Sequence, residues 1–217
     1  MQKILILLTL PLFIGCMPQK KGNRNTISFT NDSIVSNNNN AEIKAFYPVF
    51  GIQYADSVVK NLLDQQIALF RETVGEERIS ENWTNELNIQ FEVAQYNEHL
   101  VTVVFDQYWF TGGAHGNTVF SNVVMDIQQR KNYVLTDFFK GNPLTSIQAP
   151  VREKLKSEIE FHDFINEGTA SLKDFEIFAI NDSLITFYFT PYQVAPYAYG
   201  SQRISLPLPS LPDFKRP

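Results

Sequence analysis

Residues 100–127, LVTVVFDQYWFTGGAHGNTVFSNVVMDI, contain two apolar segments separated by a glycine-rich loop. The first segment, Leu100–Tyr108, places alternate apolar side chains from Val101 to Phe105 on one face, which is the pattern of a half-buried strand. The second segment, Val119–Ile127, is similarly apolar. Glycines between two such segments favour the unusual backbone angles that a chain reversal needs. The stretch therefore predicts two antiparallel strands joined by a loop.

The segments on either side extend this predicted sheet. Upstream, apolar and polar residues alternate over Leu87–Val93, and Asn97–Glu98 can turn the chain into the next strand. Downstream, a polar turn at Gln128–Asn132 precedes the short apolar run Tyr133–Leu135, which we expect to return to the sheet. The middle of the chain is therefore predicted to form an antiparallel meander.

The clearest helix is predicted before this meander, over Tyr54–Val74. Its apolar residues recur at helical spacing and make one stripe along the helix. Asp56 or Ser57 is the expected N-cap, because short polar side chains can accept hydrogen bonds from the first free N–H groups. Gly75 is the expected C-terminal stop.

A second set of elements follows the meander. A helix is expected over Pro143–Phe161, with a break or kink at Pro150 because a proline inside a helix removes one backbone hydrogen bond. The segments Phe175–Ile180 and Leu184–Thr190 then predict a hairpin, and Ile204–Leu208 adds a last strand. This order predicts an α+β fold with antiparallel sheets, each packed by a helix, and not a parallel βαβ fold.

The N-terminus has the features of a secretory signal. A basic start at Met1–Lys3 precedes the apolar run Ile4–Ile14, which is shorter than the roughly 20 residues that a membrane span needs. The run ends in Gly15-Cys16, which resembles the lipobox of bacterial lipoproteins. That resemblance implies removal of residues 1–15 and lipidation of Cys16, the chain's one cysteine. The alternative is an ordinary signal peptide with an incidental cysteine.

Residues 16–40 are expected to form a flexible tether between the lipid and the folded domain. The segment is rich in Lys, Gly, Asn and Ser, and Asn37–Asn40 is a low-complexity run that cannot bury a core. The alternative is an early strand pair that turns at Asn31-Asp32. We prefer the tether.

The composition excludes several classes of function. The formal net charge is −5, and no run of basic residues is longer than two, as at Lys20-Lys21, so a nucleic-acid partner is not expected. The three histidines do not have the spacing of metal ligands, and no aspartate-rich metal loop is present, so neither a metal nor another cofactor is expected. One cysteine cannot form an intramolecular disulfide.

Two loops contain the residues best suited to chemistry or recognition. In the first, residues 108–117, we interpret His115 as a structural hydrogen-bonding residue in preference to a catalytic base, because a base needs a partner that the sequence does not identify. The second, residues 189–200 (FTPYQVAPYAYG), carries three tyrosines, which are common at binding surfaces. These tyrosines can equally cap the sheet, and the sequence does not separate the two interpretations.

The two loops, in this order, resemble a known envelope domain. TGGAHG between strands, then Tyr133–Phe139, a helix, and FTPYQVAPYAYG are similar to the domain shared by the ectodomain of the lysozyme-responsive anti-sigma factor RsiV and the N-terminal region of the peptidoglycan deacetylase PdaC. The resemblance covers residues 43–208. It implies two consecutive α+β parts that join near Gly116: a PdaC-like part, 41–116, and an RsiV-like part, 117–217.

The resemblance implies an accessory module of the cell envelope and not an enzyme. We expect a lipid-anchored domain that binds peptidoglycan glycan or a wall-active protein such as lysozyme, and we assign no catalytic residue. The expected recognition surface is made by five aromatic side chains: Trp109, His115, Tyr192, Tyr197 and Tyr199. The expected location is outside the cytoplasm, on the outer membrane facing the periplasm if the cell has two membranes.

Two rival functions remain open. The first is a small wall hydrolase or deacetylase in which His115 works with a carboxylate such as Asp106 or Asp137. The second is a scaffold lipoprotein whose loops contact other proteins of an envelope complex. Turnover that depends on His115 would indicate the first, and a stoichiometric protein partner without glycan affinity would indicate the second.

Overall fold

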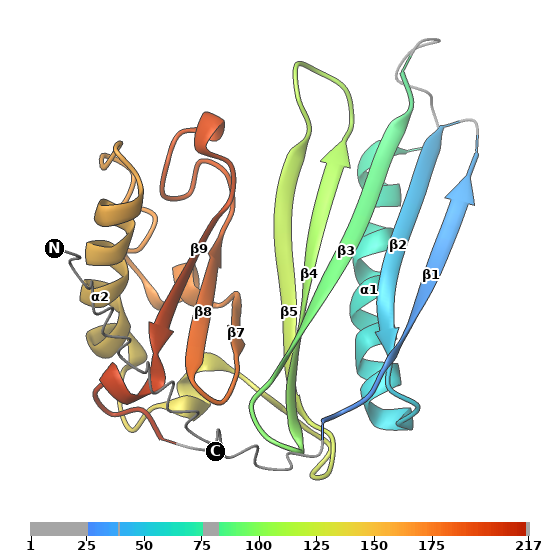
Figure 1. Cartoon of the computed structure of the whole chain (residues 1–217). Helices are drawn as coiled ribbons and strands as arrows, with labels where there is room; N and C mark the ends of the chain where they lie inside the picture. Colours follow the sequence, from blue (N-terminus) through green and yellow to red (C-terminus); the bar gives the residue numbers. More distant parts are fainter. Residues whose placement is uncertain (1–25, 39, 76–82, 216–217) are drawn as a thin grey trace, which may run out of the picture.

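The computed structural model describes residues 26–38, 40–75 and 83–215. Within them the chain forms a six-stranded sheet, a three-stranded sheet and two α-helices, and the predicted α+β class is confirmed (Figure 1). The larger elements are β1 (Thr30–Asn37), β2 (Ala41–Val49), α1 (Gln53–Val74), β3 (Asn85–Gln95), β4 (Leu100–Phe110), β5 (Asn117–Asp126), β6 (Lys131–Tyr133), α2 (Pro143–Glu158), β7 (Phe178–Ile180), β8 (Leu184–Phe189) and β9 (Gln202–Pro207). Cys16 and the expected signal segment lie outside the described residues.

The elements stack in four layers: α1, the six-stranded sheet, the three-stranded sheet and α2 (Figure 1). The buried stripe of α1 covers one face of the large sheet, and its Leu63 and Phe70 belong to one buried cluster with Val103 and Phe105 of β4. The buried side of α2, which includes Ile147, Val151 and Leu155, covers the outer face of the small sheet. Each sheet therefore has its own helix, as the sequence predicted.

The two sheets meet where the small sheet packs against β4 and β5. Because side chains alternate along a strand, the residues next to the α1-facing ones point to the small sheet. Val104 and Phe120 of the large sheet form a small buried cluster with Ala179 and Tyr188 of the small sheet. Thr102 adds a buried hydrogen bond, since its hydroxyl oxygen accepts from the backbone N–H of Ile180 at 3.3 Å.

The large sheet runs in the order β1-β2-β3-β4-β5-β6. The meander from β3 to β6 is antiparallel, as predicted. One pair departs from the expected antiparallel arrangement: β2 and β3 are parallel, from the pair Ala41–Asn85 to the pair Ala45–Ile89. α1 is the crossover that connects them, because parallel neighbours cannot be joined by a tight turn.

The tether prediction is wrong for Thr30–Asn37, which forms the edge strand β1 paired along its length with β2. Asn31 and Asp32 lie within β1, so the chain does not turn there; β1 ends at Asn37 and β2 begins at Ala41. Asparagine side chains hold the connection between the two strands: Asn38 Oδ1 accepts from the N–H groups of Asn40 (2.9 Å) and Ala41 (2.7 Å). Asn85 Nδ2 then donates to the Asn40 carbonyl oxygen and to its Oδ1, both at 3.0 Å. The polar run is therefore structural.

The helix ends also differ from the predictions. α1 begins at Gln53, so Asp56 lies within its first turn, where its Oδ1 accepts from the backbone N–H of Phe50 at 2.7 Å. The predicted stop at Gly75 is confirmed by its left-handed φ of 63°. α2 runs without a break through Pro150 and ends at Glu158, three residues before the predicted end.

Three smaller predictions need correction. Leu135 begins a short 3-10 helix, Leu135–Phe138, and does not continue the sheet. Phe175 ends another 3-10 helix, so β7 covers only Phe178–Ile180. The join expected at Gly116 falls inside the β4–β5 hairpin, so the two sheets do not divide there. In the described part of the chain, no helix is both long and apolar enough to cross a membrane.

Candidate functional site

The two loops singled out in the sequence meet at one end of the sheets. The ring of His115 stacks on the ring of Tyr197, with centroids 3.9 Å apart and an interplanar angle of 25°. The Tyr197 hydroxyl donates to the carbonyl oxygen of Gly116 at 2.8 Å. The Tyr192 ring lies 5.4 Å from the Tyr197 ring on a tilted plane. We call the row His115–Tyr197–Tyr192 the loop junction.

Glycines allow the β4–β5 loop to reach this position. Gly112 and Gly113 have φ angles of 93° and 99°, in the left-handed region that other residues avoid. Gly116 lies against the Tyr108 ring, which would have to move to make room for a Cβ at this residue. The Gly116 carbonyl oxygen also lies 2.9 Å from His115 Nδ1, which orients the imidazole.

The 189–200 loop is held by buried anchors and by Gln193. Gln193 Nε2 lies 3.2 Å from the carbonyl oxygens of Gly168 and Asp174, and its Oε1 accepts from the N–H of Thr190 at 3.2 Å. Val194 is fully buried. The residue beside these anchors, Tyr192, has a φ of 70° and a side chain that is 54% exposed. A large non-glycine residue in the left-handed region stores strain, and such residues cluster at functional sites.

The structure places the other two predicted residues apart from this row. Tyr199 ends a short 3-10 helix and is 40% exposed, but its ring does not take part in the stack. Trp109 projects from β4 toward α1 and packs edge-on against Phe70, with centroids 5.6 Å apart. The five predicted side chains therefore form one row of three, one exposed neighbour and one residue on the α1 side of the sheet.

Trp109 and His115 nevertheless share a hollow, which we call the α1 groove. It has a volume of about 460 Å³ and lies between α1 and the ends of β4 and β5. It is lined by Gln66, Leu69, Trp109, Thr111, His115, Asn117, Val119, Phe120 and Ser121. His115 belongs to both the groove and the loop junction.

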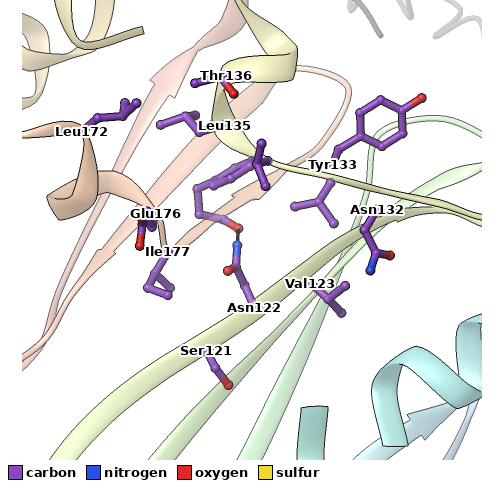
Figure 2. A pocket seen from close by; sticks show the side chains of 13 residues that line it. Ser121, Asn122, Val123, Asn132, Tyr133, Leu135, Thr136, Leu172, Glu176 and Ile177 are labelled. Carbon is purple, nitrogen blue, oxygen red and sulfur yellow. Dashed lines mark hydrogen bonds between the residues drawn. The ribbon is translucent and has the colours of Figure 1, made fainter. Parts of the chain in front are cut away.

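A second pocket, of about 570 Å³, lies lower on β5, between the two sheets (Figure 2). Several of its polar groups are already paired: Asn122 Nδ2 donates across the pocket to the carbonyl oxygen of Phe178 at 2.6 Å. Asn132 Oδ1 accepts from the Tyr54 hydroxyl at 2.7 Å. Its lining comes from segments 121–136 and 172–178, which carry no shared motif, so the sequence could not have identified it.

Arg203 is a further residue that sequence reasoning missed. From β9 it reaches across to the large sheet, with Nη1 3.0 Å from Glu92 Oε2 and Nη2 3.4 Å from Asp106 Oδ2. Its guanidinium also lies over the Tyr188 ring, 5.1 Å from the centroid. Burial raises the pKa of the Asp106 carboxyl, and the neighbouring Arg203 charge offsets only part of that rise. Arg203 therefore forms ion pairs between the small sheet and the large sheet.

Two family models match separate segments of the chain. The model described as "Deacetylase PdaC" matches residues 34–118, and the model described as "Protein of unknown function (DUF3298)" matches residues 136–208. The chain carries a domain of the PdaC/DUF3298 type. The predicted resemblance to PdaC is thereby confirmed. The first matched segment ends at residue 118 and the second begins at residue 136, so the boundary of the first falls within β5, which belongs to the six-stranded sheet.

A relative with a curated name supports the assignment. The chain is 32% identical over 167 residues to "Peptidoglycan-N-acetylmuramic acid deacetylase PdaC" of Bacillus subtilis. The match covers 74% of this chain but only 36% of that relative. The chain thus spans about a third of the relative's length.

Two solved DUF3298 structures share the fold of this PdaC/DUF3298-type domain. One, from Bacteroides fragilis, has a TM-score of 0.55 at 21% identity and covers 86% of this chain and 93% of its own. The other, from Pseudomonas aeruginosa, has a TM-score of 0.58 at 17% identity and covers 88% and 95% respectively.

The carboxylates considered as partners for His115 are engaged elsewhere in the domain. Asp106 pairs with Arg203, and Asp137 Oδ2 accepts from the N–H of Val134 at 2.9 Å, where it caps a 3-10 helix. Neither forms a hydrogen bond to His115 within the described residues. Over the same residues, no group of three or more His, Cys, Asp or Glu side chains could hold a metal ion.

Proposed function

We propose that this PdaC/DUF3298-type domain is a lipid-anchored module of the cell envelope that binds the glycan of peptidoglycan at the loop junction. The observation that carries the proposal is the row of three flat rings, His115, Tyr197 and Tyr192, built from two loops that are distant in sequence. Pyranose sugars present apolar C–H faces, and flat aromatic rings with polar edges suit both those faces and the surrounding hydroxyls.

The exposure of Tyr192 favours recognition over packing. A tyrosine that only filled the core would be buried, whereas Tyr192 is 54% exposed and adopts a left-handed backbone that costs free energy. Tyr197 is half-buried and tied to Gly116, so it serves as the fixed platform of the row. The rigid platform and the exposed end together resemble a preformed binding surface.

The name of the curated relative supports the substrate class. That protein is named for deacetylation of peptidoglycan N-acetylmuramic acid, and this chain matches one part of it. A part of a wall-acting enzyme is well placed to hold the wall polymer. We extend only this binding role to the present chain, at the level of peptidoglycan glycan.

The anchor is a separate element of the proposal and rests on the sequence Phe13-Ile14-Gly15-Cys16 after an apolar run. Two or more acyl chains on one cysteine give stable attachment, since each buried methylene contributes about 0.8 kcal/mol. Labelling of cells with radioactive palmitate should mark the chain, and Cys16→Ser should abolish the label. Retention of the label in Cys16→Ser would contradict lipidation at this residue.

Co-sedimentation with purified peptidoglycan sacculi tests the binding function. The detergent-solubilised full chain should be retained in a saturable manner, and Tyr192→Ala should weaken retention by about tenfold, or about 1.4 kcal/mol. Tyr199→Ala is the matched control, because it removes an exposed tyrosine from the same loop but outside the row. Equal loss in both variants would show that the row has no special role.

Two further outcomes would move the function elsewhere. Binding to lysozyme but not to sacculi, lost as salt rises, would indicate a basic protein partner attracted by the net charge of −5. Release of acetate or of reducing ends from sacculi, abolished in His115→Ala, would indicate an enzyme. Either outcome would contradict a glycan-binding module.

A further inference from the structure

One edge of the large sheet is open along the first part of β5. β5 pairs with β4 along its whole length, whereas β6 pairs with β5 only over residues 124–126. After β6 the backbone N–H of Val134 donates to Asp137 Oδ2 and the chain turns into a 3-10 helix, so β6 ends there. In the part of the chain that the structure describes, no strand lies beside residues 117–123 on this side of β5.

The strand register shows which backbone groups of β5 face this open edge. One position beyond the last β4–β5 pair, the N–H of Ile127 donates to the carbonyl oxygen of His99 at 2.9 Å. Hydrogen-bonded and non-bonded pairs alternate in an antiparallel ladder. Alternate residues of β5 therefore bond to β4, and the backbone groups of the residues between them point away from it: Thr118, Phe120 and Asn122. Among the described residues, these groups have no backbone partner on that side.

The edge strand of the small sheet is treated differently. Asn122 Nδ2 donates to the Phe178 carbonyl oxygen at 2.6 Å, and the Thr102 hydroxyl oxygen accepts from the Ile180 N–H at 3.3 Å. Side chains of the large sheet thus cap backbone groups of β7. The β5 edge has neither a paired strand nor such caps within the described chain, and an edge of this kind is a template for another strand.

Two hollows follow the open edge. The α1 groove is lined by Val119 and Phe120, and the pocket of Figure 2, which we call the edge pocket, is lined by Asn122 and Val123. Ser121 lines both. Neighbouring residues of a strand point to opposite faces of the sheet, so a hollow lined by such neighbours lies at the edge of the strand. The two hollows can therefore receive alternate side chains of an added strand.

The edge pocket suits an apolar side chain beside a basic one. Its wall is apolar at Leu135, Ile177 and Phe178, among others. Glu176 is the charged residue of its lining; it is exposed and forms no ion pair with any described residue. Together with the net charge of −5, this carboxylate favours a lysine or arginine on the partner.

We propose that an extended segment of a partner protein binds as an added strand along β5, antiparallel to β5 and in line with β6. Its backbone pairs with Thr118, Phe120 and Asn122, and its apolar side chains enter the two hollows. β6 runs toward the open edge, so a strand in line with it begins beside the edge pocket, where a basic residue meets Glu176. In such strand addition, main-chain hydrogen bonds give affinity and alternate side chains give specificity. This inference goes beyond glycan binding, because it concerns a protein ligand.

Fluorescence anisotropy with a short peptide tests the backbone pairing. The probe is acetyl-Lys-Val-Thr-Val-Thr-Val with a neutral fluorophore at its C-terminus, and the detergent-solubilised full chain should bind it in a saturable manner. Two control peptides carry N-methyl groups on one or the other alternate set of backbone nitrogens. Only one set faces β5, so methylation of that set should weaken binding about tenfold and methylation of the other should not. Equal affinity of the two control peptides, or no binding of the probe, would overturn the proposal.

Variants of the edge test the same pairing from the protein side. Thr118→Pro removes an N–H that points to the open edge and leaves the bonds to β4, so it should weaken binding about tenfold. Thr118→Ala, which keeps the N–H, is the matched control, and urea denaturation checks that both variants are folded. Full affinity in a folded Thr118→Pro variant would overturn the pairing.

A charge exchange tests the edge pocket. Glu176→Lys should weaken binding of the probe about fivefold, and a probe with glutamate in place of its lysine should regain that affinity. Glu167→Lys makes the same change at an exposed residue outside the pocket and is the control. Equal effects of the two variants would contradict the place assigned to the basic residue.

Amide hydrogen exchange of the unmodified chain, followed by NMR, locates the added strand without any variant. The probe should slow exchange at Phe120 and Asn122 and leave Val119 and Ser121, which already bond to β4, unchanged. Slowing confined to another strand or loop would overturn the proposal. Dimerisation of the chain without the probe, lost in Thr118→Pro, would assign the edge to a second copy and contradict a partner protein.

Discussion

Single residues fix the conformation of the 189–200 loop, and Gly168 shows this most clearly. A Cβ at this residue would overlap the backbone carbonyl of Gln193, whose side chain reaches back to the Gly168 carbonyl oxygen. The 189–200 loop therefore packs directly on the backbone of Gly168, and only a residue without a Cβ allows this close contact. The sequence does not reveal this contact, because the two residues approach only in the folded chain.

Gly168→Ala is predicted to lower the free energy of unfolding by about 1–3 kcal/mol, because a buried methyl group must push backbone aside. It should also weaken glycan binding by displacing Tyr192 and Tyr197. Urea denaturation measures the first effect and sacculi binding the second. Gly141→Ala is the control, because nothing lies within 4 Å of a Cβ there. Equal stability of the two variants would contradict the contact.

Arg203 and Asp106 allow a prediction about pH. The pKa of Asp106 is raised above its ordinary 3.8, mainly by burial, while Arg203 opposes the rise. The folded chain therefore holds this proton to higher pH than the unfolded chain, and ionisation of Asp106 lowers stability as pH rises through the window just above 3.8.

Arg203→Met is predicted to raise the pKa of Asp106 further, since the effect of burial is then unopposed. The loss of stability should extend to higher pH. NMR titration of the Asp106 carboxyl carbon measures the pKa, and Arg203→Lys, which retains the positive charge, is the control. An unchanged or lower pKa in Arg203→Met would contradict the pairing.

At the residue scale, the sequence predicted part of the arrangement of the two loops. It identified His115, Tyr192 and Tyr197 as members of one surface, and the structure brings these three together. It did not separate Trp109, which lies on the α1 side, because the face of a strand residue depends on the register of the whole sheet. Arg203 could not be identified either, because its partners lie on strands far away in sequence.

At the scale of elements, the apolar periodicity of the sequence predicted helices and strands correctly where the periodic segment was long. The apolar stripe of α1 and the alternation in the meander both predict the observed elements, since each buries one face. The patterns failed for β1, which is an exposed edge strand with little apolar periodicity. Its polar sequence is typical of a tether, and its place in the sheet depends on pairing with β2.

The asparagine turn between β1 and β2 gives a prediction at this scale. Asn40 Nδ2 donates to the Gly75 carbonyl oxygen at 2.8 Å, and Asn40 Oδ1 accepts from Asn85, so this side chain links the turn, the end of α1 and the start of β3. Asn40→Ala should lower the free energy of unfolding by about 1–3 kcal/mol, because it leaves buried groups unpaired.

Thermal or urea denaturation tests this expectation. Asn37→Ala is the matched control, because it makes the same change in the same asparagine run at an exposed position. Its effect should stay within about 0.5 kcal/mol. A similar loss in both variants, or no loss in Asn40→Ala, would restore the view of this run as a simple spacer.

At the scale of the whole molecule, the two sheets share apolar packing, because Leu100 and Val124 of the large sheet belong to the same buried cluster as the small sheet, and specific contacts add to it. A small apolar cluster, Arg203 and the bond from Asn122 to Phe178 connect them, while His115 and Tyr197 close the end where the loops meet. The proposed binding surface therefore needs both parts of the chain to be docked. The order of elements predicted the α+β class, but it could not predict that β5 belongs to the first sheet, because strand pairing is a tertiary property.

Binding of peptide-free glycan strands to the full chain tests the central claim most directly. These strands are prepared by amidase treatment of sacculi, so any binding comes from sugar alone. We predict saturable binding that is insensitive to salt, weakened about tenfold in Tyr192→Ala and unchanged in Tyr199→Ala. Absence of binding, or equal affinity of the native chain and Tyr192→Ala, would contradict the assignment of the loop junction as a glycan-binding surface.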